Sequence, residues 1–176
     1  AKHTELILDE IDKITKTMDP ILHVILTGGE PYLRHDLDQI VRIFYENTKM
    51  PIVTIPSNGW YLDKMSLQIK NMMKWCPDLI LNQLISLDGL EEEHDEIRMK
   101  GLKKGLGAKG SFQKALNSMN LIKELQKEFG RINLGVQMTF TSQNQHKIID
   151  SIKGIYEFTK PDNITIALVR GDPKEK

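Results

Sequence analysis

The sequence is poor in cysteine, in net charge and in long apolar runs, and each shortage excludes a class of protein. The single cysteine, Cys76, excludes an internal disulfide and any metal or iron-sulfur site built only from thiolates of this chain. It stands between Trp75 and Pro77 after a helical pattern, which predicts a buried, unreactive thiol. The 24 Lys and Arg residues balance 24 Asp and Glu residues, so no overall field would attract nucleic acid or an anionic membrane.

No apolar run approaches the ~20 residues that a membrane-spanning helix needs, and no signal-peptide pattern opens the chain. A soluble cytoplasmic protein is therefore expected. The 176 residues, of which 40% are hydrophobic and 27% charged, suit a single domain over residues 1 to 176 with a core of ordinary size. The five histidines show no metal-ligand spacing, so they predict no metal site.

Helical and strand patterns alternate along the whole chain. Apolar residues at helical spacing predict helices within 4 to 18, 37 to 44, 62 to 73, 112 to 125 and 148 to 155. Short β-branched runs predict strands within 21 to 27, 52 to 56, 79 to 87, 132 to 140 and 163 to 169, the first of them covered on both faces. This order predicts an α/β fold with a parallel sheet and right-handed crossovers, either wound on both faces or curled toward a barrel. Because a helix comes first and a strand comes last, we expect further segments of the domain on both sides.

Each predicted strand leads into a segment of glycine and small polar residues. The segments are Thr27-Gly28-Gly29-Glu30-Pro31, Ser57-Asn58-Gly59, Ser86-Leu87-Asp88-Gly89, Thr141-Ser142-Gln143-Asn144 and Arg170-Gly171-Asp172. The carboxyl ends of parallel strands share one rim, where ligands bind in such folds, so the five segments are expected to converge there. Turns and helix caps use the same residue types, which is a sufficient explanation for any one segment alone.

Glu30 is the residue that turn chemistry does not require. Gly28 and Gly29 let the backbone pass close to a ligand, while Pro31 fixes the following φ and removes one N–H. The result is a rim rich in acceptors that carries a negative charge. Such a rim suits an ammonium group better than a phosphate.

At these residues the chain resembles the radical S-adenosylmethionine (SAM) enzymes. TGGEPYLRHDL looks like the GGEP motif of that superfamily, SNGWYL like the turn after its third strand, and VQMTFTSQN like its fifth strand. SLDGLEEEHDEIR followed by GSFQKAL is similar to the fourth-strand segment of the peptide- and cofactor-modifying branch. ELILDEIDKI resembles the first helix, so the resemblance covers nearly the whole chain in the right order.

The resemblance implies a partial TIM-like (β/α)6 barrel. The first strand and the CxxxCxxC loop, whose thiolates hold a [4Fe-4S] cluster in that superfamily, are absent from this chain. In the intact enzyme, reductive cleavage of SAM would give a 5′-deoxyadenosyl radical that abstracts hydrogen from an unknown small-molecule or peptide substrate. An electron donor such as flavodoxin or ferredoxin is the implied partner, and this fragment alone is expected to be inactive.

The resemblance also implies cofactor-binding residues, and it assigns no residue a catalytic role. Glu30, next to Pro31 and with the carbonyls of Gly28 and Gly29, would hold the SAM amine, and Ser57 and Asn58 would shape the neighbouring rim. Ser86 or Asp88 would meet the ribose. Further candidates, for contacts to the adenine or the carboxylate, are Thr141, Asn144 and Arg170.

Two other functions stay open. One is a catalytically inactive module that binds SAM or a nucleoside on the same fold. The other is an NAD-type oxidoreductase based on GLGAKG (105 to 110), although a charged helix or loop, and no strand, precedes this G-x-G-x-x-G pattern. Around this pattern we expect an exposed insertion over 99 to 110, a helix cap at Ser111, and an i,i+3 pair between Asp95 and Arg98.

Overall fold

The computed structural model describes residues 5–100 and 110–168. In chain order the elements are α1 (Leu8–Thr15), β1 (His23–Ile25), the 3-10 helix η1 (Pro31–Leu33), α2 (Leu37–Thr48), β2 (Ile52–Ser57), α3 (Leu62–Trp75), β3 (Ile80–Ser86), α4 (Glu91–Lys100), α5 (Ser111–Phe129), β4 (Ile132–Phe140), α6 (Ile148–Thr159) and β5 (Asn163–Leu168). Helix and strand alternate as the sequence predicts, with α4 as an additional helix before α5. Among the described helices, none combines the length and the apolar character needed to cross a membrane.

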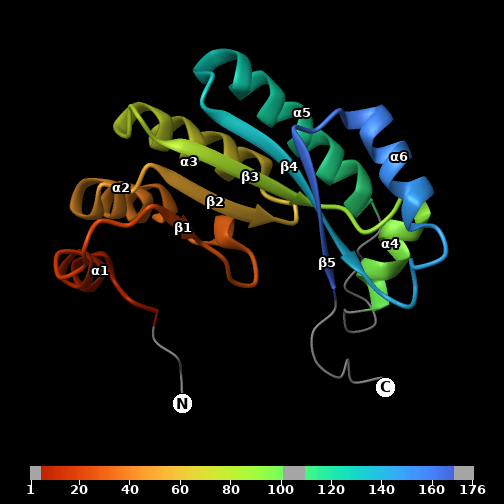
Figure 1. Ribbon diagram of the computed structural model, residues 1–176, viewed down its shortest axis with the longest axis horizontal. Helices are drawn as coiled ribbons and strands as arrows, with labels where there is room; N and C mark the ends of the chain where they lie inside the picture. The colour runs from red at the N-terminus through yellow and green to blue at the C-terminus, as the bar shows by residue number, and fades with distance from the viewer. Residues whose placement is uncertain (1–4, 101–109, 169–176) are drawn as a thin grey trace.

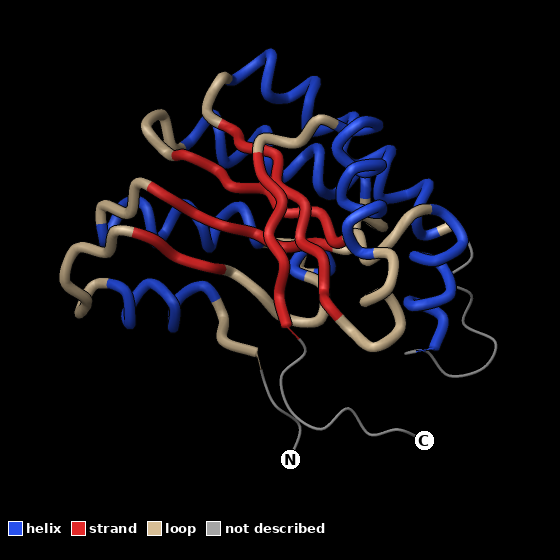
Figure 2. Tube along the Cα trace, turned by 45° about the vertical axis from the view of Figure 1, so that its right-hand side comes forward, coloured by secondary structure: helices blue, strands red, loops and turns tan. Residues whose placement is uncertain are grey.

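The five strands form one sheet in the order β1-β2-β3-β4-β5, and every neighbouring pair is parallel. Figures 1 and 2 show that this sheet curls, with α2, α3, α5 and α6 on its convex face. The predicted parallel α/β fold is therefore confirmed, and of the two expected arrangements the structure has the curled one, a half-barrel consistent with part of a TIM-like barrel. All five strands end at the same rim, which is the condition for a shared site.

The core lies between the sheet and the helices on its convex face. Along β3, Leu81, Gln83 and Ile85 are buried, whereas the alternating Asn82 and Ser86 are half-buried and face the concave side. This period of two is the signature of a strand with different surroundings on its two faces. The helices complete the same buried cluster with large side chains, including those of Met65, Met72, Phe112, Met119 and Ile122.

β1 departs from the sequence-based expectation in length and in cover. It spans three residues, and both His23 and Ile25 are exposed, so the prediction of a strand covered on both faces is wrong. β1 lies at the edge of the described sheet, and helices cover only the convex face. Thr54 of β2 hydrogen-bonds the exposed imidazole, with His23 Nε2 and Thr54 Oγ1 2.8 Å apart.

Candidate functional site

Glu30 is at the centre of the first strand-end turn. Pro31 starts η1, and Glu30 is the N-cap of this short helix, with Oε1 accepting a hydrogen bond from Tyr32 N at 3.2 Å. The same oxygen accepts from Ser57 Oγ at 2.9 Å, and Oε2 accepts from Asn58 N at 2.8 Å. The carboxylate therefore joins the turn after β1 to the carboxyl end of β2.

Gly28 and Gly29 lie immediately before this carboxylate, and both are exposed. Neither has a positive φ, and a Cβ built on either would meet no described atom within 4 Å. Backbone conformation and packing within the described structure therefore give no reason for glycine at these two positions. Open space beside an exposed backbone without side chains allows the close approach of a ligand. We refer to residues 28 to 31 as the glycine turn.

The turn after β2 is fixed by its own side chains. Ser57 Oγ accepts from Gly59 N at 3.1 Å, and Asn58 Oδ1 accepts from Trp60 N at 2.9 Å. Gly59 has a φ of +76°, and a Cβ there would lie 3.0 Å from the Cα of Ala115 in α5. Both the conformation and the close approach of α5 require glycine at this position.

Asp88, just after β3, is buried in an ion pair. Its Oδ2 lies 2.8 Å from Arg98 Nη2 of α4, and its Oδ1 accepts from Thr139 N of β4 at 2.8 Å. The carboxylate thus connects the ends of β3 and β4 to α4. The prediction of an Asp95–Arg98 pair is wrong, because Arg98 reaches back to Asp88 instead.

Asp95 holds the start of α5. Its Oδ1 accepts from Ser111 Oγ at 2.7 Å and from Phe112 N at 2.9 Å, and its Oδ2 accepts from Gly110 N at 2.6 Å. Burial alone would raise the pKa of the Asp95 carboxyl, but these hydrogen bonds outweigh it and the pKa is lowered. The N-cap of α5 is Gly110 and Ser111 is the first helical residue, so the predicted cap at Ser111 is also wrong.

His94 lies beside the Asp88–Arg98 pair. Burial of the ring and, to a smaller extent, the positive charge of Arg98 lower its pKa from 6.5 to about 4, although the nearby carboxylates of Asp88 and Asp95 act in the opposite direction. The ring is therefore neutral near pH 7, and its Nδ1 accepts a hydrogen bond from Asp88 N at 3.0 Å. A protonated ring could not accept this bond, since both ring nitrogens would then be donors.

Asn144 stabilises the loop after β4. Its Nδ2 donates to the carbonyl oxygens of Asp88 and Thr139 at 2.9 and 2.8 Å, and its Oδ1 accepts from Thr141 N at 2.8 Å. The side chain is fully buried, so its amide is committed to backbone groups of this loop. Thr141 is half-buried at the surface of the same loop.

The predicted site residues thus form two groups in the structure. Glu30, Ser57 and Asn58 bond to one another at the ends of β1 and β2, and Asp88, Thr141 and Asn144 are connected at the ends of β3 and β4. Ser86 is half-buried, and it pairs in the ladder with Gln137 of β4. Arg170 lies outside the described residues.

Sequence reasoning missed two buried polar residues beside the glycine turn. Tyr32 and Gln83 are both 0% exposed, and Tyr32 Oη donates to Gln83 Oε1 at 2.5 Å. Burial raises the pKa of Tyr32 well above its ordinary value, with a further contribution from the charge of Glu30, so the hydroxyl stays protonated. The only signal for Gln83 in the sequence is an amide in the middle of the otherwise apolar strand pattern LILNQLISL.

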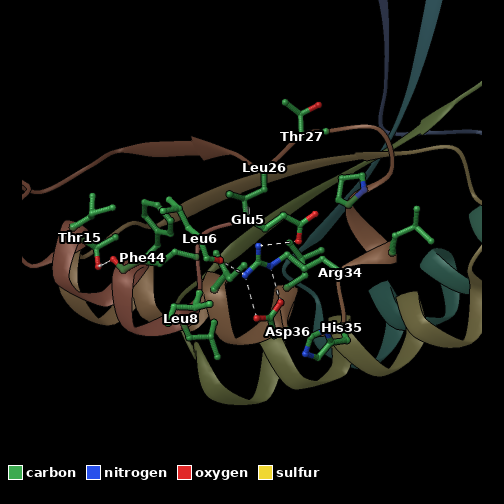
Figure 3. A pocket seen from close by; sticks show the side chains of 18 of the residues that line it. Glu5, Leu6, Leu8, Thr15, Leu26, Thr27, Arg34, His35, Asp36 and Phe44 are labelled. Atoms are coloured by element: carbon green, nitrogen blue, oxygen red, sulfur yellow. Dashed lines mark hydrogen bonds and ion pairs between the residues drawn. The ribbon is translucent and has the colours of Figure 1, made fainter. Parts of the chain in front are cut away.

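A cleft of about 1200 Å³ lies between α1, the glycine turn and the start of α2. Arg34 lies within it, as Figure 3 shows. Its Nη2 donates to Leu6 O at 2.7 Å, and its Nε donates to Asp36 Oδ1 at 2.7 Å. Asp36 is the N-cap of α2 as expected, but its side chain binds Arg34 rather than the helix N–H groups. Arg34, the residue that follows η1, therefore ties the segment before α1 to the start of α2.

No group of His, Cys, Asp and Glu within the described residues could hold a metal ion. Cys76 is buried, as predicted, and burial raises its pKa to about 11, which agrees with the expectation of an unreactive thiol. These residues do not fit a [4Fe-4S] cluster. Thiolates for such a cluster would have to come from outside the described residues.

The GLGAKG segment lies outside the described residues except for Gly110. The element that precedes it is α4, a helix, whereas a dinucleotide fingerprint follows a strand. The described structure therefore gives the NAD-type function no support. The expected insertion over 99 to 110 also falls almost entirely outside the described residues.

Comparison with known proteins finds curated relatives, although no protein-family model matches the chain. The GTP 3',8-cyclase of Listeria monocytogenes serotype 4b is 29% identical over 154 residues, which cover 87% of this chain and 40% of that protein. The GTP 3',8-cyclase of Aliarcobacter butzleri is 36% identical over 74 residues, which cover 42% of this chain and 21% of that protein. These relatives support the radical SAM resemblance.

The alignment with the Listeria proteins covers most of this chain but less than half of each relative. The chain spans 40% of the length of the Listeria relatives that match 87% of it, so the similarity concerns one part of those proteins. Nothing in the comparison supports the peptide-modifying branch that the fourth-strand segment suggested. The relatives are enzymes by name, which agrees with the expectation of an enzyme.

Proposed function

We propose that this chain is part of a radical SAM enzyme and that its glycine turn receives the methionyl amine of SAM. The observation that carries the proposal is the turn itself, in which two exposed glycines that the described fold does not require precede a braced carboxylate. The curled parallel sheet and the similarity to GTP 3',8-cyclases support the same function.

Each part of the turn has its own role in this proposal. The backbone at Gly28 and Gly29 gives the amine close access to carbonyl oxygens. Glu30 supplies negative charge at the rim, while its hydrogen bonds to Ser57 and Asn58 keep the turn against the end of β2. Ser86 and Thr141, two half-buried residues of the rim, are the candidates for contact with the nucleoside part of SAM.

When bound and reduced at its sulfonium, SAM would supply the radical that abstracts a hydrogen atom from the substrate. The protein residues orient the cofactor and exclude water around it. We also propose a one-electron donor such as flavodoxin or ferredoxin as a partner. GTP is the first substrate to test, because the similar proteins are named for it.

The test is formation of 5′-deoxyadenosine by the intact protein, reconstituted anaerobically with iron and sulfide and reduced with dithionite in the presence of SAM, with and without GTP. We expect 5′-deoxyadenosine from the unmodified protein. A preparation that retains its iron and binds SAM but forms none would instead be a binding module on the same fold.

A glycine variant tests the turn directly. Gly29→Ala should leave the free energy of unfolding within ~0.5 kcal/mol, because the added Cβ meets no neighbouring atom. It should weaken SAM binding about tenfold or more, equivalent to ~1.4 kcal/mol. Unchanged SAM affinity in equilibrium dialysis would remove the glycine turn from the binding site.

A further inference from the structure

Tyr32 and Gln83 form a polar contact inside the core, beneath the glycine turn. The phenol and the amide come from η1 and β3, and neither side chain is exposed. Gln83 Nε2 donates to Ile55 O at 2.8 Å and to Leu84 O at 3.3 Å. Since these carbonyls take the NH₂ group, the amide oxygen has to face Tyr32, and the hydroxyl has one direction in which to donate.

Tyr32 also connects this buried contact to the rim. Its backbone N–H donates to Glu30 Oε1, the same oxygen that accepts from Ser57. The glycine turn is therefore held by two anchors, the half-buried carboxylate of Glu30 at the end of β2 and the buried hydroxyl of Tyr32 at β3. Water can compete for the first anchor but not for the second.

We propose that Tyr32 and Gln83 are positioning residues that fix the glycine turn in its ligand-binding geometry, an inference that rests on the proposed SAM site. Packing alone does not need the hydroxyl, because a phenylalanine ring would fill the same space in the core. The hydrogen bond adds direction: it sets the rotation of η1 against the sheet, and η1 follows the turn directly. A turn free to rotate would present its carbonyls in several orientations and bind an ammonium group less tightly.

The test separates positioning from stability with three variants of the intact protein. Tyr32→Phe leaves the amide oxygen of Gln83 buried without its partner and should lower both the melting temperature and the affinity for SAM. In the double variant Tyr32→Phe/Gln83→Met, no amide oxygen is left buried without a partner, which should restore part of the melting temperature; the bonds from Gln83 Nε2 to Ile55 O and Leu84 O are lost as well, so recovery is not complete. Ile122→Val, in the fully buried part of α5, is the control for a core change away from the turn.

If the pair positions the turn, the double variant stays about tenfold weaker in SAM binding than the unmodified protein even though its melting temperature is higher than that of Tyr32→Phe. Amide hydrogen exchange should then be faster over residues 28 to 34 and at Asn58 in both Tyr32 variants, and unchanged there in Ile122→Val. Recovery of SAM affinity together with the melting temperature, or equal exchange of this segment in all variants, would overturn the inference.

The exchange measurement also keeps this inference distinct from the proposed function. If the unmodified protein binds no SAM, the proposed function fails. Faster exchange of the glycine turn in the Tyr32 variants would still show that the buried pair fixes it, and unchanged exchange would show that it does not.

Discussion

At the scale of single residues, burial sets the protonation state of His94. The ring is 1% exposed and has a pKa of about 4 in the folded protein, against 6.5 for an ordinary histidine. Between these two values the unfolded chain binds a proton that the folded protein does not bind. The free energy of unfolding therefore falls as the pH is lowered from 6.5 to 4, by about 3 kcal/mol at the most, and this contribution is fully present only above pH 6.5.

His94→Asn should remove this pH dependence. The asparagine Oδ1 can take the place of Nδ1 as acceptor for Asp88 N, and it does not titrate in this range. Urea unfolding of the intact protein and the variant at pH 7 and pH 5 gives the comparison. We expect the unmodified protein to lose more stability than the variant on acidification; equal losses would show that His94 is not buried in its neutral form.

The carboxylates of the rim show how far residue types alone can predict a site. Glu30 and Asp88 stand out in the sequence because they follow predicted strands, and the structure places both at the rim. The sequence also placed Ser57 and Asn58 at the rim near Glu30, but it did not predict that they bond the carboxylate, because they lie 27 and 28 positions away along the chain. The bond from Thr139, 51 positions from Asp88, was not predicted either. The same carboxylate pattern can serve a ligand or the protein's own N–H groups, and only the fold distinguishes them.

At the scale of elements, the start of α5 depends on a side chain from α4. Asp95 accepts hydrogen bonds from the backbone N–H groups of Gly110 and Phe112, which the helix itself leaves without partners, and a third from the hydroxyl of Ser111. Asp95→Ala should therefore destabilise the protein by about 1 to 2 kcal/mol, as loss of a good N-cap does.

The matched control is Asp63→Ala, which removes an exposed acidic residue from the first turn of α3. This change loses only the interaction with the helix dipole, about 0.3 to 1 kcal/mol. Denaturant unfolding of both variants provides the measurement. A loss at Asp95 no larger than that at Asp63 would contradict the capping role.

The elements themselves were largely predictable because their apolar periodicities differ so clearly. The helix α5 and the strands β3 and β4 have long patterns of one period, and their predicted positions agree with the structure to within a few residues. The cap of α5 was not predictable, since Ser111 is a common capping residue and nothing local indicates that Asp95, in another helix, supplies the acceptor. The prediction for β1 was wrong because an edge strand of three residues can have an apolar sequence and still be exposed.

At the scale of the whole molecule, the rim of the half-barrel is held by two braces. Glu30 joins the ends of β1 and β2, and Asp88 joins the ends of β3 and β4 to α4. The buried pair of Tyr32 and Gln83 connects the first brace to β3. The alternation of elements predicted the parallel sheet, but its curl depends on which face the helices cover, and each helix pattern shows only that one side of the helix is apolar.

The second brace should contribute more to stability than a surface carboxylate does. The Asp88 side chain is 6% exposed and that of Arg98 33%, so Asp88→Asn leaves a guanidinium without its counter-charge in a partly dehydrated position. We expect the free energy of unfolding to fall by about 2 to 4 kcal/mol, somewhat below the range for a fully buried pair because Arg98 retains some water.

The control is Glu124→Gln, which breaks an exposed pair with Lys127 and should change the free energy of unfolding by at most ~0.5 kcal/mol. Urea unfolding at pH 7 measures both, and amide exchange at Thr139 reports the lost contact locally. If Asp88→Asn costs no more than the control, the ion pair does not hold the rim, and Asp88 becomes available again as a group that contacts the ligand.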